Sequence, residues 1–131
     1  AITMENHGPL HLERVAPEDM QQLYGTAPPA GCEDLTIYLR HLRNANRMIG
    51  SLHMQLDALK RPVSLCWYGD HVPIMPTVYA TFGQPSGLVP YACWRNSAAR
   101  SNAAENGLPP QLLTADMLSC QWLAGLGLWR D

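Results

Sequence analysis

The sequence has 131 residues, of which 47% are hydrophobic and 15% are charged, so it can bury a core and lacks the composition of a disordered protein. Its formal net charge is −2 and its Lys and Arg residues form no cluster, which argues against a nucleic-acid-binding surface. No apolar stretch is long enough to span a membrane, and no signal-peptide pattern opens the chain.

The N-terminal part of the sequence is predicted to be the end of a strand, at 1–4, followed by a long loop. Residues 5–31 are rich in proline and glycine, which is typical of a loop. A short helix is expected at 17–24 within it, because Pro17 suits a first helical turn and two acidic residues follow it. The chain also lacks an initiator Met, so we expect it to be a fragment of a longer polypeptide.

The clearest predicted element is a long amphipathic helix at about 33–60. Leucine and isoleucine recur there at steps of three and four, which places them on one helical stripe, and polar residues fall largely on the opposite side. The apolar positions are Leu35, Leu39, Leu42, Ile49, Leu52, Leu56 and Leu59. We expect Arg61 and Pro62 to end this helix, and its apolar stripe to pack on a sheet.

Two short apolar runs and a second helix follow. Residues 62–68 are expected to form a buried strand with turn signals at both ends. Residues 88–94 are expected to form a second strand, in which Pro90 favours an edge position or a bulge. A closing helix at about 110–124 should stop at Gly125-Leu126-Gly127. This order of elements predicts an α/β fold with a few mostly buried strands.

The cysteines lie far apart in the sequence and show no CxxC or zinc-finger spacing. They are Cys32, Cys66, Cys93 and Cys120. Cys66 and Cys93 fall in the apolar strand-like runs, where a buried free thiol is the more common state. The spacing neither requires nor excludes disulfides.

The segment from Gly69 to Pro73, with Asp70 and His71 side by side, directly follows the predicted strand at 62–68. Ligand sites of open α/β sheets gather at the carboxyl ends of strands, and adjacent Asp and His side chains suit Zn, Mn or Mg. Gly69 is expected to let the backbone turn sharply there. Asp70 and His71 are therefore either metal ligands or parts of a plain turn, in which Asp70 caps the next segment. The preceding strand and the following proline favour the metal site.

A second candidate segment, Glu5-Asn6-His7-Gly8-Pro9, also follows a predicted strand end. The imidazole of His7 is a suitable donor to an anionic oxygen of a substrate. Alternatively, Asn6 and His7 bond their own backbone, and the segment taken alone favours this second interpretation.

The order and spacing of these features resemble the C-terminal half of a sulfatase-like catalytic domain of the alkaline phosphatase superfamily. The shared order is a strand into His7-Gly8-Pro9, a long helix after Tyr38-Leu39-Arg40, and an apolar strand into Gly69-Asp70-His71. The later strand at 88–94 and the closing helix also match. Similar proteins include lipoteichoic acid synthases, phosphoethanolamine and phosphoglycerol transferases, and sulfatase-like proteins of polysaccharide biosynthesis. The resemblance covers nearly all of residues 1–131 and implies the C-terminal portion of an alkaline-phosphatase-like fold.

The resemblance also implies roles for individual residues. Asp70 and His71 would bind a divalent metal ion (Mn, Mg, Zn or Ca), and His7 would contact the anionic phospho- or sulfo-ester substrate. The family's nucleophile and a further acidic ligand lie upstream of the matched region, and no residue here takes their place. We therefore expect the full-length parent to be a hydrolase or transferase, and this chain alone to bind metal weakly or not at all and to be inactive.

Further expectations concern substrate, location and association. The similar proteins imply a cell-envelope or surface-polysaccharide substrate, and a parent at the bacterial inner membrane or facing the periplasm. A half-domain would expose a sheet edge, so we expect self-association through it. Two other functions stay open, namely a non-catalytic interaction module and a small self-contained metal-dependent hydrolase that uses His7, Asp70 and His71.

Overall fold

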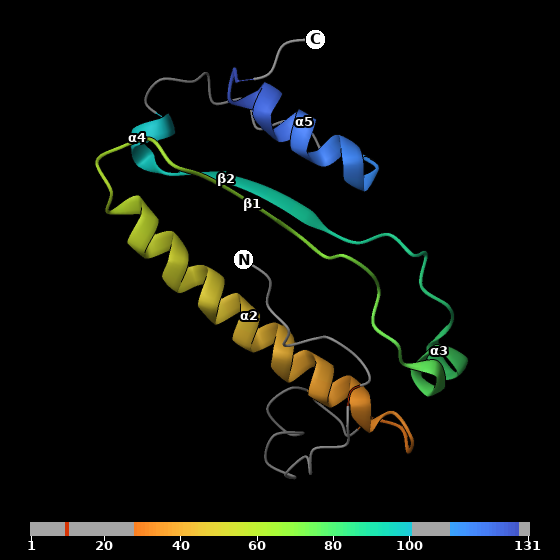
Figure 1. Ribbon diagram of the computed structural model, residues 1–131. Coiled ribbons are helices and arrows are strands. Elements are labelled where there is room, and N and C mark those ends of the chain that lie inside the picture. Colours follow the sequence, from red (N-terminus) through yellow and green to blue (C-terminus); the bar gives the residue numbers. More distant parts are fainter. Residues whose placement is uncertain (1–9, 11–27, 101–110, 129–131) are drawn as a thin grey trace. The chain divides into compact units, whose positions relative to one another are not determined.

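The structure is a computed structural model that describes residues 10, 28–100 and 111–128 (Figure 1). The predicted strand at 1–4, most of the predicted loop and the predicted helix at 17–24 lie outside these residues. The elements are α2 (Glu33–Asp57), β1 (Ser64–Tyr68), α3 (Pro76–Phe82), β2 (Tyr91–Arg95), α4 (Ser97–Arg100) and α5 (Ala115–Gly125). The chain divides into two compact units, the first taking 1–54 with 69–90 and the second 55–68 with 91–131.

Helix α2 confirms the predicted amphipathic helix, although it ends at Asp57 and not near 60. Two acidic residues in its first turn suit the positive end of the helix dipole. The predicted leucine stripe is largely half-buried, and Leu42 remains 41% exposed. The most buried residues of α2 are Thr36 and Ile37. The period of the sequence therefore identifies the helix but not the positions that are buried most deeply.

The core of the first unit lies at the start of α2 and along α3. Cys32, Met75 and Val78 are buried at its centre, and partly buried hydrophobic residues pack on them, namely Leu10, Leu35, Tyr38 and Tyr79. Gly31 precedes α2 with a φ of 83°, and a Cβ there would lie 3.2 Å from Cγ2 of Thr77. Both the backbone conformation and the close approach therefore favour glycine at this turn.

Helix α3 is absent from the sequence prediction. Pro76 stands at its first turn, and Gly83 follows its last residue with a φ of 97°. The N–H of Gly83 donates to the carbonyl oxygen of Tyr79 at 2.9 Å. Proline at the start and glycine just past the end are ordinary helix signals. A helix of 7 residues is too short to show a clear hydrophobic period.

Strands β1 and β2 form a two-stranded antiparallel sheet in which Ser64 lies opposite Arg95 and Tyr68 opposite Tyr91. Pro90 lies just before β2, opposite Gly69, whose N–H donates to its carbonyl oxygen at 3.1 Å. Pro90 has no N–H to return the second hydrogen bond of this pair, so the regular ladder ends here. The prediction of mostly buried strands is wrong for these residues, which are half-buried or exposed. This sheet has two strands within the described chain, so side chains on each face are covered by a neighbouring strand from one side only.

Helix α5 confirms the predicted closing helix but begins after Thr114, five residues later than expected. Its C-terminus forms a Schellman motif. The N–H of Gly127 donates to Ala124 at 2.9 Å and the N–H of Leu128 donates to Leu123 at 3.0 Å. Gly127 has a φ of 70°, which explains why the glycine-containing segment stops this helix, as the sequence predicts.

Polar contacts join α5 to the sheet within the second unit. The indole N–H of Trp122 donates to Oγ of Ser64 at 2.7 Å, and this hydroxyl donates to the carbonyl oxygen of Trp94 at 3.1 Å. The guanidinium of Arg95 donates to the carbonyl of Gly125. Helices beside a small sheet agree with the coarse α/β prediction. None of the helices between 28 and 128 that the structure describes is long and apolar enough to cross a membrane.

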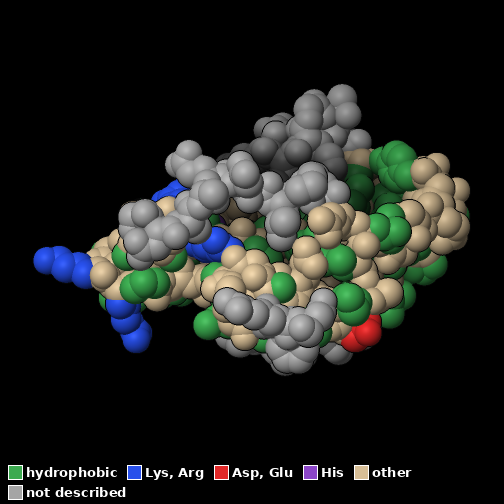
Figure 2. All heavy atoms as spheres, turned by 90° about the horizontal axis from the view of Figure 1, so that it is seen from above, with side chains coloured by type: hydrophobic (Ala, Val, Ile, Leu, Met, Phe, Trp, Pro, Cys, Tyr) green, Lys and Arg blue, Asp and Glu red, His purple; other side chains and the backbone are tan. Residues whose placement is uncertain are grey.

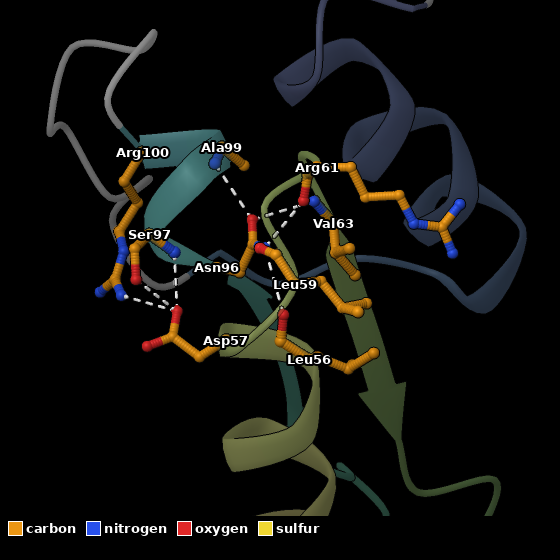
Figure 3. Close-up of polar contacts among 9 residues, drawn as sticks. All are labelled: Leu56, Asp57, Leu59, Arg61, Val63, Asn96, Ser97, Ala99 and Arg100. Carbon is orange, nitrogen blue, oxygen red and sulfur yellow. Dashed lines mark hydrogen bonds and ion pairs between the residues drawn. The ribbon is translucent and has the colours of Figure 1, made fainter.

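Asn96 is fully buried and connects three segments of the second unit (Figure 3). Its side-chain nitrogen lies 3.2, 3.1 and 2.9 Å from the carbonyl oxygens of Leu56, Leu59 and Arg61. Its Oδ1 accepts the N–H groups of Val63 and Ala99, each at 3.0 Å. The nitrogen thus satisfies carbonyls where α2 ends, and the bond from Ala99 caps the N-terminus of α4. These contacts explain why α2 ends earlier than its leucine period suggests.

Asp57, the last residue of α2, binds the first turn of α4 (Figure 3). Its Oδ1 accepts the N–H of Ser97 at 2.7 Å and the Ser97 hydroxyl at 2.6 Å. Nη2 of Arg100 lies 3.7 Å from the same oxygen. The hydroxyl hydrogen bond, followed by the backbone one, lowers the pKa of the Asp57 carboxyl from its ordinary value. The end of α2 and the start of β1 are therefore fixed by side chains from α4 and its cap.

Candidate functional site

Gly69, Asp70 and His71 follow β1 directly, as the sequence predicts. The N–H of Gly69 donates to the carbonyl oxygen of Pro90 at 3.1 Å. The chain bends at Asp70 and His71, directly after Gly69. Gly69 is not among the described glycines with a positive φ, so its backbone conformation does not itself require glycine. The residue is needed for another reason, because a Cβ here would lie 3.2 Å from Cβ of Val89.

Asp70 and His71 are both open to solvent, with side chains 78% and 48% exposed. Nδ1 of His71 lies 2.9 Å from the carbonyl oxygen of Val72. Since a carbonyl can only accept, Nδ1 is the donor in this contact, and in the neutral imidazole this leaves a lone pair on Nε2. Nε2 lies 3.7 Å from Oδ1 of Asp70, which also accepts the N–H of His71 at 3.0 Å.

This arrangement fits a divalent metal ion in spacing and chemistry. Two ligands, each about 2.1 Å from one tetrahedral ion, lie about 3.4 Å apart. The observed 3.7 Å between Nε2 of His71 and Oδ1 of Asp70 is close to that separation. A metal-bound histidine commonly donates its other ring N–H to a carbonyl, as His71 does to Val72. The two side chains can therefore act as a pair of ligands with little rearrangement.

The pair is incomplete as a metal site. Zinc sites in proteins ordinarily use three or four protein ligands. Among the residues that the structure describes, no group of three or more His, Cys, Asp and Glu side chains could hold a metal ion. The hydrogen bonds of Asp70 and His71 would also form in a plain surface turn, so the metal-ligand assignment stays a prediction.

Of the remaining histidines, two lie outside the described residues and two lie on α2. His7, predicted to contact the substrate anion, lies outside the described residues, and so does His11. His41 and His53 lie on α2 and are half-buried.

Sequence reasoning missed the role of Asn96 and the alignment of two cysteines. Asn96-Ser97 after a strand is an ordinary N-cap signal, and it could have identified α4. The bonds of Asn96 to the end of α2 have no local signal, because their acceptors lie 35 to 40 residues away. Cys66 lies opposite Cys93 in the strand register. The sequence prediction does not give this register, and it starts the second strand at 88, three residues before β2 begins.

Comparison with known proteins identifies the family. The family model described as Sulfatase matches residues 1–119. This chain belongs to the sulfatase family. The match agrees with the resemblance carried by His7-Gly8-Pro9 and Gly69-Asp70-His71, both of which lie inside it.

One relative of this sulfatase-family chain comes from Rhizobium meliloti (strain 1021). It bears the name "Putative cyclic beta-1,2-glucan modification protein" and is 31% identical over 91 residues. The matched segment covers 67% of this chain and 14% of the relative, so the chain spans about one seventh of that protein's length. No solved structure gives a significant match.

Proposed function

We propose that this chain supplies part of the metal-dependent site of a sulfatase-family hydrolase or transferase. The substrate would be a sulfo- or phospho-ester of a cell-envelope or surface polysaccharide. Membership of the sulfatase family supports the ester chemistry, and the name of the R. meliloti relative supports a glucan-type substrate. The observation that carries the proposal is the 3.7 Å separation of Nε2 of His71 and Oδ1 of Asp70, with Nδ1 held by Val72.

Each residue has a defined part in the proposed site. A divalent ion would lower the pKa of a hydroxyl nucleophile and offset the charge that develops on the ester. Asp70 supplies a charged oxygen ligand and His71 a neutral nitrogen ligand, while the Val72 carbonyl fixes the tautomer and orientation of the imidazole. His7 is proposed to donate a hydrogen bond to an anionic oxygen of the substrate.

The nucleophile is proposed to come from outside residues 1–131. The chain offers no Thr or Ser in the context that the family uses, and Asp70 with His71 make only part of a ligand set. A site with two ligands holds an ion weakly. We therefore propose that the chain alone binds divalent ions weakly and does not turn over substrate.

Paramagnetic broadening in NMR spectra tests the ligand pair even if binding is weak. Excess Mn²⁺ should broaden the ring signals of His71 and the amide signals around Asp70 before other signals. Asp70→Asn and His71→Gln should each abolish this selective broadening, because either change removes one of two ligands. Asp116→Asn is the matched control, since Asp116 is also an exposed carboxylate. Equal broadening in all variants would show that Asp70 and His71 bind no metal.

Activity measurements test the incompleteness of the site. The chain, supplied with Mn²⁺ or Zn²⁺, should hydrolyse neither aryl sulfates nor phosphodiesters above the rate of the metal alone. Turnover by the chain that disappears in His71→Gln would contradict the proposal. That result would instead identify a small self-contained hydrolase.

A further inference from the structure

Cys66 and Cys93 lie directly opposite each other on β1 and β2. Both are free thiols, Cys93 exposed and Cys66 half-buried. Opposite residues of an antiparallel pair project to the same face of the sheet, so the two thiols share a face. The pair is therefore positioned by the backbone pairing and not by a flexible loop.

The hydrogen-bond pattern shows which type of pair this is. The N–H of Asn96 donates to the carbonyl oxygen of Val63 at 3.0 Å, which makes these two residues a hydrogen-bonded pair. Hydrogen-bonded and non-hydrogen-bonded pairs alternate along an antiparallel ladder. Cys66 lies three residues after Val63, so it and Cys93 form a non-hydrogen-bonded pair. Cα atoms of such pairs are about 4.5 Å apart, within the range of about 4.4–6.8 Å that a disulfide bridges.

We propose that Cys66 and Cys93 are a thiol–disulfide exchange site that forms a reversible cross-strand disulfide, with a low-molecular-weight disulfide as the oxidant. The proposal goes beyond the ester chemistry and does not rest on it. Its basis is the register of β1 and β2, the free state of both thiols and the exposure of Cys93.

The two thiols differ in reactivity. Burial, a hydrogen bond with Cys93 and repulsion by a charge on Cys93 together raise the pKa of the Cys66 thiol to about 12. Since the thiolate is the nucleophile, Cys66 reacts slowly at neutral pH. The exposed Cys93 therefore attacks the external disulfide first, and Cys66 resolves the mixed disulfide afterwards.

The exchange has two balanced steps. The Cys93 thiolate attacks one sulfur of the external disulfide RSSR, which forms a Cys93–SR bond and releases RS⁻. Cys66 then loses its proton to water and attacks Sγ of Cys93, which forms the Cys66–Cys93 bond and releases the second RS⁻. The protein thiols lose two protons and two electrons in total, and RSSR gains them to become two RSH.

Exposure also favours reversal. Cys93 is exposed, and exposed disulfides are more easily reduced than buried ones. The link would lie four residues before Asp70 in the sequence, at the strand that leads into Gly69. Oxidation would thus tie β1 to β2 just ahead of the candidate metal ligands.

Peptide mapping of the chain tests the proposal directly. Cleavage at methionine places each of the four cysteines on a different fragment, and Met75 separates Cys66 from Cys93. The chain is incubated with oxidised glutathione, its remaining thiols are blocked, and it is cleaved without reduction. We expect fragments 55–75 and 76–117 to be joined, to separate on reduction, and to be found unlinked after excess reduced glutathione.

Variants distinguish this link from others. A Cys32→Ser/Cys120→Ser double variant should keep the joined fragments, because it retains both proposed partners. Cys66→Ser should lose them and stop at glutathionylated Cys93, and circular dichroism would show whether that variant folds. In the unsubstituted chain, a mixed disulfide on Cys93 that persists, no reaction, or a link from Cys93 to Cys32, Cys120 or a second copy would each overturn the proposal.

Discussion

The carboxamide of Asn96 performs a task that no other side chain of its size can perform. It presents N–H donors to the carbonyls of the α2 end and, at the same time, one oxygen acceptor to Val63 and Ala99. An aspartate would offer acceptors alone, and an aliphatic residue would offer neither. Because the side chain is fully buried, a lost partner cannot be replaced by solvent without rearrangement.

We predict that Asn96→Asp destabilises the chain by about 3 kcal/mol or more, because it removes the donors of several carbonyls and buries a carboxylate beside them. The free energy of unfolding in urea measures the change. Asn44→Asp is the matched control, since Asn44 is exposed on α2, and it should change stability by less than about 0.5 kcal/mol. Equal effects of the two variants would contradict the role of Asn96.

The Asp57 carboxyl makes stability depend on acid pH. Its pKa is lowered in the folded chain by hydrogen bonds from the Ser97 hydroxyl and N–H. At acid pH the folded state therefore binds fewer protons than the unfolded state does. The stabilisation is fully present above the ordinary pKa of 3.8 and is lost as the pH falls through the lower folded value. We predict that Ser97→Ala reduces the loss of stability below pH 3.8, as measured by urea unfolding across the acid range. If Asp57→Asn and the unsubstituted chain show the same acid profile, this coupling is absent.

At the scale of elements, periodicity predicts the long helix and short apolar runs predict the two strands, while tertiary contacts set their ends. The sequence pattern continues past Asp57, but Asn96 takes up the carbonyls of Leu56 and Leu59 and ends α2 there. The sequence predicts Pro90 inside the second strand, at an edge position or a bulge, whereas β2 begins at Tyr91, directly after it. Helices α3 and α4 are too short for periodic signals and depend on their caps. The placement of Asp70 and His71 after a strand is predictable, whereas the bond that orients the imidazole is not.

Two glycines in helical segments should respond to alanine with opposite signs. Gly50 lies exposed inside α2 and a Cβ there meets nothing within 4 Å, so Gly50→Ala should stabilise the chain by about 0.5–1 kcal/mol. Gly127 ends α5 with a φ of 70°, so Gly127→Ala should destabilise it by about 1 kcal/mol. Urea unfolding of both variants measures these changes. The same sign for both would show that backbone conformation does not govern these positions.

At the scale of the whole molecule, a large share of the apolar surface remains open. Hydrophobic side chains are spread over the face that Figure 2 shows. Large exposed ones include Met54, Tyr68, Ile74, Phe82, Leu88, Leu112 and Leu128, each more than half exposed. Each of these side chains leaves apolar surface available for contact with another protein surface.

We predict that the isolated chain self-associates through the outer edge of β1. The backbone groups of Ser64, Cys66 and Tyr68 belong to non-hydrogen-bonded pairs and point away from β2, and Tyr68 is 59% exposed. Sedimentation velocity should therefore show a sedimentation coefficient that rises with protein concentration. Tyr68→Lys should reduce this rise, because a lysine on an edge strand opposes strand pairing. Asn44→Lys makes the same change of charge on the exposed side of α2 and should leave association unchanged. A chain that stays monomeric at every concentration would show that this edge does not pair.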